Sequence, residues 1–354
     1  MTGLRTVAFL LAVTLFCGFS PFSASAARPE TAQEVVVYNW SEYIPQDVLD
    51  DFSKETGIKV VYSTFESNEA MYAKVKLLRG KGYDVVVPST YFVELLRDEK
   101  LIQPLDRTRI KNLENLDPTL LNQAYDPGNA YSVPYMCGIL GLSYNSKYIK
   151  PGTLKAWKDL LRPEFKGKII LTDDLRDAFG LALLAKGHSV NSVDPAEIRQ
   201  AADFLGQLKS SVRVFDVTAI KQALISEEVW TGPIWNGDYL VALDENPDLA
   251  FIFPEEGGIP WVDSFVITSG AVNVENAYAF ISYMLRPDVA LRCMEEFKYT
   301  SPNLAAVSLL PPEQRQNRIF IPGPEEMKNA EYILSIGKTL EEYEKYWERI
   351  KALR

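Results

Sequence analysis

Trp261 and Asp263 are the two residues of this sequence whose spacing points most directly to chemistry. They lie in the segment 257–265, just after two glycines and at the start of a strand-like run over 264–268. Residues two apart on a strand face the same side, so an indole and a carboxylate are presented together. An organic cation with a hydrocarbon stem suits this pair, because ring faces attract an ammonium group and a carboxylate neutralises it. The plain alternative is a core tryptophan beside a solvated aspartate.

The elements that must position these residues alternate between strand and helix. Apolar patterns predict strands at 34–40, 58–65 and 83–87, with helices between them at 45–55 and from Ser67 to Gly80. Further strands are predicted at 168–171, 250–253 and 265–267, and further helices at 194–209, 274–285, 287–297, 325–336 and 339–352. The order indicates an α/β protein with a mainly parallel sheet and helices on both faces, and the length indicates two domains.

Aromatic, hydroxyl and carboxylate side chains gather where these strands end. In open α/β sheets, ligands bind beyond the carboxyl ends of the strands. The residues expected there are Trp40, Ser41 and Tyr43 after the first strand, Ser89 and Tyr91 after the third, and Asp174 and Asp177 after the strand at 168–171. Trp235 is expected beside a loop. Asp173 or Asp174 could equally cap a helix, and capping does not exclude ligand binding. Core packing alone would not require this pattern.

Bulk properties exclude several function classes. The formal net charge of −10 disfavours nucleic acid and anionic membranes as partners. His188 is the only histidine and lies in a segment typical of a loop that ends a helix, which argues against a histidine-dependent nucleophile. Scattered Cys and His residues do not supply a zinc site, and we expect neither a metal nor a cofactor.

The N-terminus predicts export. Arg5 precedes an apolar run over 7–16 that is too short to span a bilayer, and Ala24-Ser25-Ala26 provides a cleavage site, so residues 1–27 are assigned to a signal peptide. Cys17 is an alternative site for a lipid anchor. The remaining cysteines, Cys137 and Cys293, could pair, but nothing in the sequence brings them together and we expect buried thiols.

Long motifs resemble the spermidine/putrescine-binding periplasmic proteins of bacterial polyamine ABC importers. The similar segments are 37–45, 55–60, 63–74, 83–91, 171–174, 234–237, 257–264 and 299–306. The resemblance implies a two-lobed periplasmic binding protein fold with a hinged cleft and no catalysis. It implies lobes at 28–140 plus 258–305 and at 141–257 plus 306–354, a polyamine ligand, an inner-membrane ABC permease as partner, and a monomer in the periplasm.

The resemblance also implies roles for single residues. Trp40, Ser41, Tyr43, Ser89 and Tyr91 would line the cleft from the first lobe. Asp174 and Asp177 would hold a terminal amine from the second lobe, Trp235 and Trp261 would sandwich the alkyl chain, Asp263 would pair with an amine, and Tyr299 would close one side. Ser41 replaces a Thr, Asp177 replaces a longer Glu, and Ile333 replaces a ligand-holding Gln. The last change makes putrescine at least as plausible a ligand as spermidine.

Other interpretations stay open at this point. Paired carboxylates such as Asp174 or Asp177 with Asp263 would also suit a glycosidase. A solute-binding protein for ferric iron would use Tyr43, Tyr91 or Tyr299 as ligands. A solute-binding protein for a sugar would use Trp40, Trp235 and Trp261. A receptor that senses polyamine and signals to a membrane protein would have the same sequence features.

Overall fold

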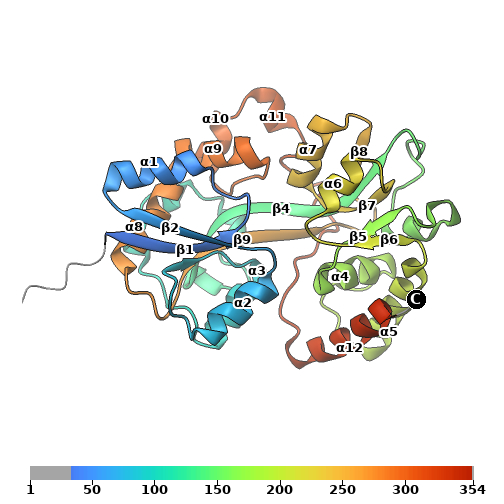
Figure 1. Ribbon diagram of the computed structural model, residues 1–354, viewed down its shortest axis with the longest axis horizontal. Helices are drawn as coiled ribbons and strands as arrows, with labels where there is room; N and C mark the ends of the chain where they lie inside the picture. The colour runs from blue at the N-terminus through green and yellow to red at the C-terminus, as the bar shows by residue number, and fades with distance from the viewer. Residues whose placement is uncertain (1–32, 353–354) are drawn as a thin grey trace, which may run out of the picture. The chain divides into compact units, whose positions relative to one another are not determined.

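A computed structural model describes residues 33–352 of the chain. The predicted signal peptide at 1–27, with Cys17, lies outside the described residues. Within that range, nine strands form one sheet in the order β2-β1-β3-β9-β4-β7-β5-β6, with β8 paired to β4 (Figure 1).

Three parallel strands at one end of the sheet form the first lobe. β1 pairs in parallel with β2 on one side and with β3 on the other. This order of strand, helix and strand confirms the predicted parallel arrangement. The elements are β1 (Glu34–Trp40), α1 (Gln46–Thr56), β2 (Lys59–Phe65), α2 (Asn68–Leu77), β3 (Val85–Val86) and α3 (Thr90–Asp98).

Three parallel strands at the other end form the second lobe, where β5 lies between β6 and β7. The elements are β5 (Ile169–Leu171), α4 (Leu175–Ala185), α5 (Pro195–Lys209), β6 (Val212–Phe215), α6 (Ile220–Ile225), β7 (Thr231–Trp235), α7 (Asn236–Glu245) and β8 (Leu249–Ile252).

Two long antiparallel strands, β4 (Ser132–Asn145) and β9 (Ile259–Ile267), join the lobes. β9 pairs with β3 of the first lobe and β4 pairs with β7 of the second, so both strands cross the middle of the sheet (Figure 1). The remaining helices are α8 (Val274–Met284), α9 (Pro287–Phe297), α10 (Leu304–Leu309), α11 (Pro312–Gln316) and α12 (Leu340–Ala352). Short 3-10 helices lie at Arg107–Arg109, Leu113–Asn115, Pro118–Leu120, Pro127–Asn129, Trp157–Leu161, Pro163–Phe165 and Gly337–Thr339.

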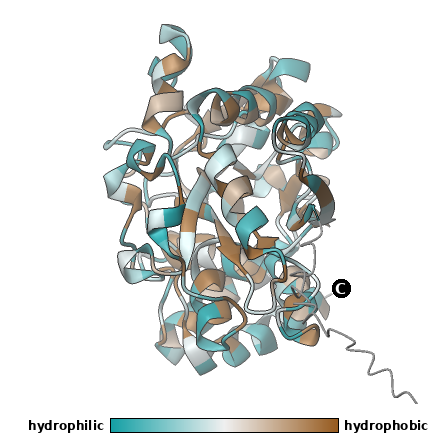
Figure 2. Cartoon of the chain, turned by 90° about the vertical axis from the view of Figure 1, so that its left-hand side faces the viewer, coloured by the Kyte–Doolittle hydropathy of each residue, from teal (hydrophilic) through white to brown (hydrophobic). Residues whose placement is uncertain are grey.

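Helices cover both faces of the sheet in both lobes. α1, α8 and α9 pack over one face of the first lobe, where Val35, Val37 and Val85 point toward them. α2 and α3 cover the opposite face, which continues into the layer of α4, α5 and α12 in the second lobe. α6 and α7 complete the second lobe. Figure 2 shows apolar residues along the central strands and hydrophilic residues on the outer helices. Burial on both faces explains why the parallel strands read as continuous apolar runs.

The predicted helix at 325–336 is wrong. Residues 331–336 have no regular secondary structure and the preceding residues form turns. Tertiary hydrogen bonds capture this backbone: the Glu331 N–H donates to the Gly258 carbonyl, and the Leu334 N–H donates to Asn191 Oδ1. These bonds replace the local bonds that a helix would use, so apolar periodicity alone misled the prediction.

The thiols of Cys137 and Cys293 do not form a disulfide. Cys293 is buried as expected, whereas Cys137 is partly exposed. Across residues 33–352, no helix combines the length and the apolar character needed to cross a bilayer.

A matched pair of leucines tests this account of the core. Leu96 on α3 is fully buried, whereas Leu77 at the end of α2 is 78 % exposed. Leu96→Ala should lower the free energy of unfolding by about 2–5 kcal/mol, because it removes buried methyl groups and leaves a cavity. Leu77→Ala should change it by less than about 0.5 kcal/mol. Urea titrations compare the two, and equal effects would contradict the packing of α3.

Candidate functional site

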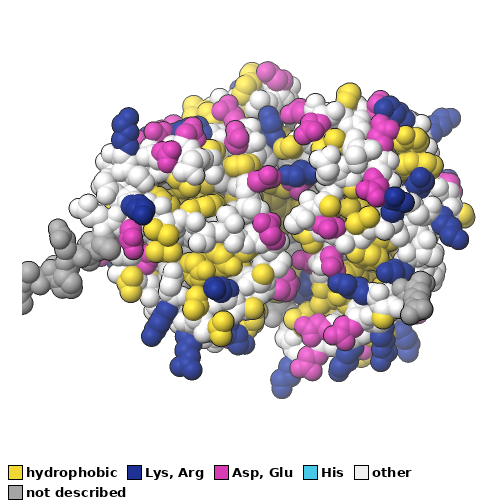
Figure 3. Space-filling view, in the orientation of Figure 1, with side chains coloured by type: hydrophobic (Ala, Val, Ile, Leu, Met, Phe, Trp, Pro, Cys, Tyr) yellow, Lys and Arg dark blue, Asp and Glu magenta, His cyan; other side chains and the backbone are white. Residues whose placement is uncertain are grey.

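A cavity of about 1040 Å³ lies between the two lobes. Figure 3 shows acidic side chains along the hollow between the left-hand and right-hand halves of the molecule. The structure brings all of the sequence-predicted site residues together at this cavity. They are Trp40, Ser41, Tyr43, Ser89, Tyr91, Asp174, Asp177, Trp235, Trp261, Asp263 and Tyr299.

Aromatic rings form walls of the cavity, and two glycines make room for them. The Trp261 ring meets the Tyr299 ring edge-on, with centroids 5.2 Å apart. A Cβ on Gly138 would lie 2.6 Å from the Trp261 indole, and a Cβ on Gly237 would lie 2.3 Å from the Tyr299 ring. The absence of a side chain at Gly138 on β4 and at Gly237 on α7 therefore leaves room for the two rings.

Asp263 is the central anion of the site. Its side chain is 4 % exposed and comes from β9. The Tyr43 hydroxyl donates to Asp263 Oδ2 at 2.5 Å, and the Ser89 hydroxyl donates to Oδ1. Burial raises the pKa of Asp263 to about 7, although both hydrogen bonds act in the opposite direction. A carboxylate without a cationic partner is costly to keep ionised here, so the site favours the arrival of a cation.

A second group of acids, Glu69, Asp174 and Asp177, lies at another part of the cavity. Asp174 caps α4, since its Oδ1 accepts from the Arg176 and Asp177 N–H groups at 2.8 and 2.9 Å. Burial raises the pKa of Asp177 well above its usual range, and the charges of Asp174 and Glu69 add to the effect. Burial and the charge of Asp174 likewise raise the pKa of Glu69. Two lobes supply this group, because Glu69 belongs to α2 and the aspartates belong to α4.

Ser41 and Tyr91 contribute hydroxyl side chains to the lining of the cavity. Ser41 donates to Glu66 Oε2 at 2.8 Å, so its hydroxyl is engaged within the first lobe. Tyr91 begins α3 and is nearly buried, and the Arg176 guanidinium lies 5.4 Å from its ring centroid across the cavity. Trp40 ends β1, as the sequence predicted, and Trp235 ends β7, a strand that was not predicted.

Sequence reasoning missed most of the acidic residues of the cavity, among them Glu42, Glu69 and Asp238. Glu69 lies in the first turn of the helix after β2, so the strand-end rule could have found it. Asp238 lies three residues after Trp235 at the start of α7, a spacing that puts both on one side of a helix. Glu42 lies between two residues that were predicted.

Basic groups at the cavity are outnumbered and already engaged. Ten carboxylates and three basic side chains line it. Arg176 donates to the Leu334 and Val190 carbonyls behind the cavity wall, at 3.0 and 3.2 Å. Lys351 pairs with Asp173 at 2.6 Å, and Lys221 pairs with Glu42 at 3.0 Å. The field in the cavity therefore remains negative.

Other candidate chemistries find little support at this site. Ile333 lines the cavity with an apolar side chain, at the position where the resemblance expected a Gln. His188 lies outside the cavity lining and contacts Gln200 and Glu197. Within residues 33–352, no group of His, Cys, Asp and Glu is arranged to hold a metal ion. Aromatic walls with buried carboxylates best fit a slender organic cation.

Comparisons with known proteins agree with this geometry. The family model for bacterial extracellular solute-binding proteins matches residues 47–318. The spermidine/putrescine-binding periplasmic protein of Escherichia coli is 42% identical over 96% of this chain and 98% of its own length.

Two solved structures share the fold. A spermidine/putrescine ABC transporter substrate-binding protein from Streptococcus pneumoniae is similar with a TM-score of 0.80 and 38% identity, over 90% of this chain and 98% of that one. A putative spermidine/putrescine ABC transporter protein from Listeria monocytogenes has a TM-score of 0.87 and 35% identity, over 91% of this chain and 100% of that one.

The buried Asp263 predicts a pH-dependent stability. The folded protein keeps this carboxyl protonated up to about pH 7, whereas the unfolded chain ionises near 3.8. Its contribution to folding stability is therefore lost as the pH rises from about 4 to about 7. Asp263→Asn does not titrate, so its free energy of unfolding relative to the parent should rise by about 3 kcal/mol between pH 5 and pH 8.

Asp106→Asn provides the control for that experiment. Hydrogen bonds from Thr108 hold the pKa of Asp106 below its usual value. The stability from this group is complete above about pH 4, so any deficit of Asp106→Asn should be the same at pH 5 and pH 8. Urea titrations at the two pH values measure both variants. A difference between Asp263→Asn and the parent that stays constant would contradict the raised pKa of Asp263.

Proposed function

This chain belongs to the family of bacterial extracellular solute-binding proteins, and we propose that it captures putrescine or spermidine in the cleft between its lobes and delivers the polyamine to an ABC permease for import. The observation that carries the proposal is Asp263, a buried carboxylate without a cationic partner that lies two residues from the Trp261 ring. The relatives named above, which bind spermidine and putrescine, support the choice of ligand.

The interaction energies are sufficient for tight binding. A charge-assisted hydrogen bond contributes roughly 1.5–3 kcal/mol and a cation–π contact about 0.5–2 kcal/mol. Each methylene buried between indoles adds about 0.8 kcal/mol. Two ammonium groups and four methylenes therefore offset the ordering costs and still reach micromolar affinity, which requires about 8 kcal/mol.

Each ligand end meets a different set of partners. One ammonium would lie against Asp263, with Tyr43 and Ser89 holding the carboxylate in place. The other would lie among Glu69, Asp174 and Asp177, where Tyr91 forms the wall. The alkyl chain between them would pass the Trp235 and Trp261 rings. Tyr299 and Trp40 would complete the enclosure, and Ser41 would contact the ligand near Glu66.

Ligand capture would couple to closure of the lobes. A ligand that contacts both lobes favours the closed arrangement, and the permease would recognise that arrangement. We assign the hinge to the segments that pass between lobes: β4, β9 and the chain between α11 and α12 (Figure 1). The residue ranges given to the lobes from the sequence remain a prediction.

The proposal extends to the location of the protein. We infer that a signal peptide at 1–27 directs export to the periplasm and that the protein acts there as a monomer. In the alternative in which Cys17 is lipidated, the N-terminus of the mature protein would be anchored by that lipid instead of being free. We assign the protein no reaction, in keeping with relatives that are named as binding proteins. A receptor that senses polyamine and signals to a membrane protein would bind the ligand in the same cleft.

A ligand panel tests the function. Putrescine, cadaverine, spermidine and spermine should be compared by thermal denaturation, since a ligand that binds only the folded state raises the melting temperature. We expect putrescine or spermidine to give the largest rise, and a sugar or ferric iron to give none. If no polyamine moved the melting temperature while another solute did, the assigned ligand class would be wrong.

Removal of the central charge should weaken binding strongly. Asp263→Asn keeps the shape of the side chain and deletes its charge, so the affinity for putrescine should fall by about 2–5 kcal/mol in titration calorimetry. Asp177→Ala should cost less, because Glu69 and Asp174 remain at that end of the cavity. An unchanged affinity in Asp263→Asn, with a large loss in Asp177→Ala, would place the anchor in the second lobe.

Binding should tighten as the pH rises through neutrality. Putrescine requires an ionised Asp263, which is about one-tenth ionised at pH 6 if its pKa is about 7. The affinity should therefore rise by about tenfold between pH 6 and pH 8. Calorimetry in buffers with different heats of ionisation should also detect proton release at pH 6. An affinity that does not depend on pH in this range would argue against a protonated anchor.

A further inference from the structure

Lys221 places an ammonium group of the protein inside the ligand cavity. It is the second residue of α6, and its side chain is 27 % exposed. Its Nζ lies 3.0 Å from Glu42 Oε2 and 3.5 Å from Asp238 Oδ1, and all three residues line the cavity. Glu42 follows β1 in the first lobe, whereas Lys221 and Asp238 belong to the second. The ion pair between Lys221 and Glu42 therefore crosses the cleft.

The lysine side chain has the chemistry of the proposed ligand. It consists of a four-carbon stem that ends in a primary ammonium, which is also the structure of one end of putrescine. Burial lowers the pKa of Lys221, but the carboxylates of Asp238 and Glu42 outweigh this effect and raise it overall. The group is thus charged at neutral pH, and it fills a position that a ligand ammonium could otherwise take.

Lys221, Glu42 and Asp238 form a charged group separate from the one around Asp263, and each such group in the cavity is called a station below. Tyr299 is close to both Asp238 and Asp263: its hydroxyl contacts Asp238, and burial, followed by the charges of both aspartates, raises its pKa. The Tyr299 ring lies 6.0 Å from that of Tyr43, which holds Asp263. Tyr299 therefore lies near both aspartates, but only Asp238 of the two is paired with Lys221. Burial has the largest effect on the pKa of Asp238 and raises it, whereas Lys221 and the Tyr299 hydroxyl lower it.

The cavity acids discussed here form three stations: Asp263, Glu69 with Asp174 and Asp177, and Glu42 with Asp238. At the last of these, the protein itself places one ammonium group against two carboxylates. Lys221 supplies the cation at Glu42 and Asp238. No basic side chain contributes to the pKa shift of Asp263. At the station of Glu69, Asp174 and Asp177, burial raises the pKa of both aspartates and the charge of Arg176 lowers it, but Arg176 is one cation beside three carboxylates, and its guanidinium donates to backbone carbonyls. Two stations remain for ligand ammonium groups, which is the number that a diamine provides.

We propose that Lys221 sets the length of the polyamine that this protein accepts, because its ammonium group occupies the third cationic position and leaves the cleft matched to a diamine. The inference rests on the proposed function and deepens it. Without Lys221, Glu42 and Asp238 would be free to pair with a third ligand ammonium, so a triamine would gain a contact that a diamine cannot reach.

The test is the ratio of two affinities. Dissociation constants for putrescine and spermidine should be measured by calorimetry in the parent and in Lys221→Met, at one pH and ionic strength. The ratio should shift toward spermidine by about tenfold or more in Lys221→Met, which is the effect of one additional charge-assisted hydrogen bond. Loss of the ion pair between the lobes affects both ligands alike, so it changes each affinity but not their ratio.

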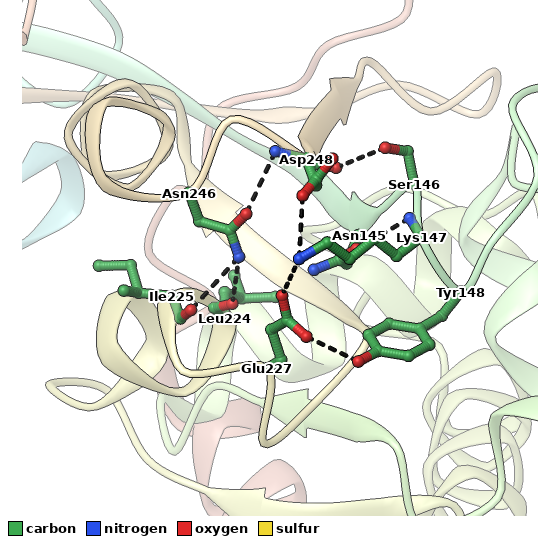
Figure 4. A network of polar contacts seen from close by, with 9 residues as sticks. All are labelled: Asn145, Ser146, Lys147, Tyr148, Leu224, Ile225, Glu227, Asn246 and Asp248. Carbon is green, nitrogen blue, oxygen red and sulfur yellow. Dashed lines mark hydrogen bonds and ion pairs between the residues drawn. The ribbon is translucent and has the colours of Figure 1, made fainter.

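Two variants control for charge and for general effects. Lys221→Arg keeps the positive charge and should keep the parent ratio. Lys147 has a matched arrangement on the outside of the second lobe, where its Nζ lies 2.6 Å from Glu227 Oε1 and 3.0 Å from Asp248 Oδ2 (Figure 4). Lys147→Met removes a lysine from between two carboxylates outside the cavity lining and should leave the ratio unchanged. If Lys221→Met does not fold, Lys221→Gln replaces it as the variant in which the ratio of affinities is measured.

The outcomes separate this inference from the proposed function. A parent that binds putrescine, together with a ratio that stays within about threefold in Lys221→Met and Lys221→Gln, would overturn the role of Lys221 and leave the function intact. An equal shift in Lys147→Met would also overturn it, because the effect would then be one of overall charge. A parent that binds neither polyamine would overturn both proposals.

Discussion

Carboxylates removed from water without a cationic partner are the feature on which the rest of this structure depends. Asp263 is held by two hydroxyl groups, which fix its position but do not supply the positive charge that would keep it ionised. Burial raises the pKa of Asp177, and the charges of Asp174 and Glu69 raise it further. Folding tolerates these groups because they can remain protonated while the cleft is empty. A ligand cation removes that penalty when it enters.

The fold serves this arrangement by bringing strand ends from two lobes to one cavity. β1 and β3 deliver the first-lobe residues, β5 and β7 deliver those of the second, and β9 carries Trp261 and Asp263 through the middle. Gly138 on β4 and Gly237 on α7 leave room for the Trp261 and Tyr299 rings. Because neither lobe contains the complete set of partners, ligand binding and the approach of the lobes are energetically linked.

Much of the site follows from local sequence rules. The two-residue spacing of Trp261 and Asp263 places both on one face of β9, and the ends of the parallel strands locate Trp40, Ser89 and Asp174. The parallel strands are predictable because burial on both faces makes them continuously apolar. The cap formed by Asp174 was also one of the alternatives that its position allowed.

Other parts depend on contacts that local patterns do not encode. The segment at 325–336 has helical periodicity, but its backbone is bound by Asn191 and Gly258 from elsewhere in the chain. β4 was not predicted, although it connects the lobes. The role of Lys221 could not be predicted from the local sequence, because it depends on the ion pair with Glu42, which lies 179 positions away. Long-range pairing of this kind appears only in the structure.

A direct test of the central claim is the titration of the Asp263 carboxyl group, followed by the ¹³C chemical shift of its side-chain carbon with and without saturating putrescine. The account predicts a pKa of about 7 in the empty protein and a value well below that in the complex, because the ligand ammonium stabilises the ionised form. Identical titration curves in the two states, or an empty-state pKa near 3.8, would contradict it.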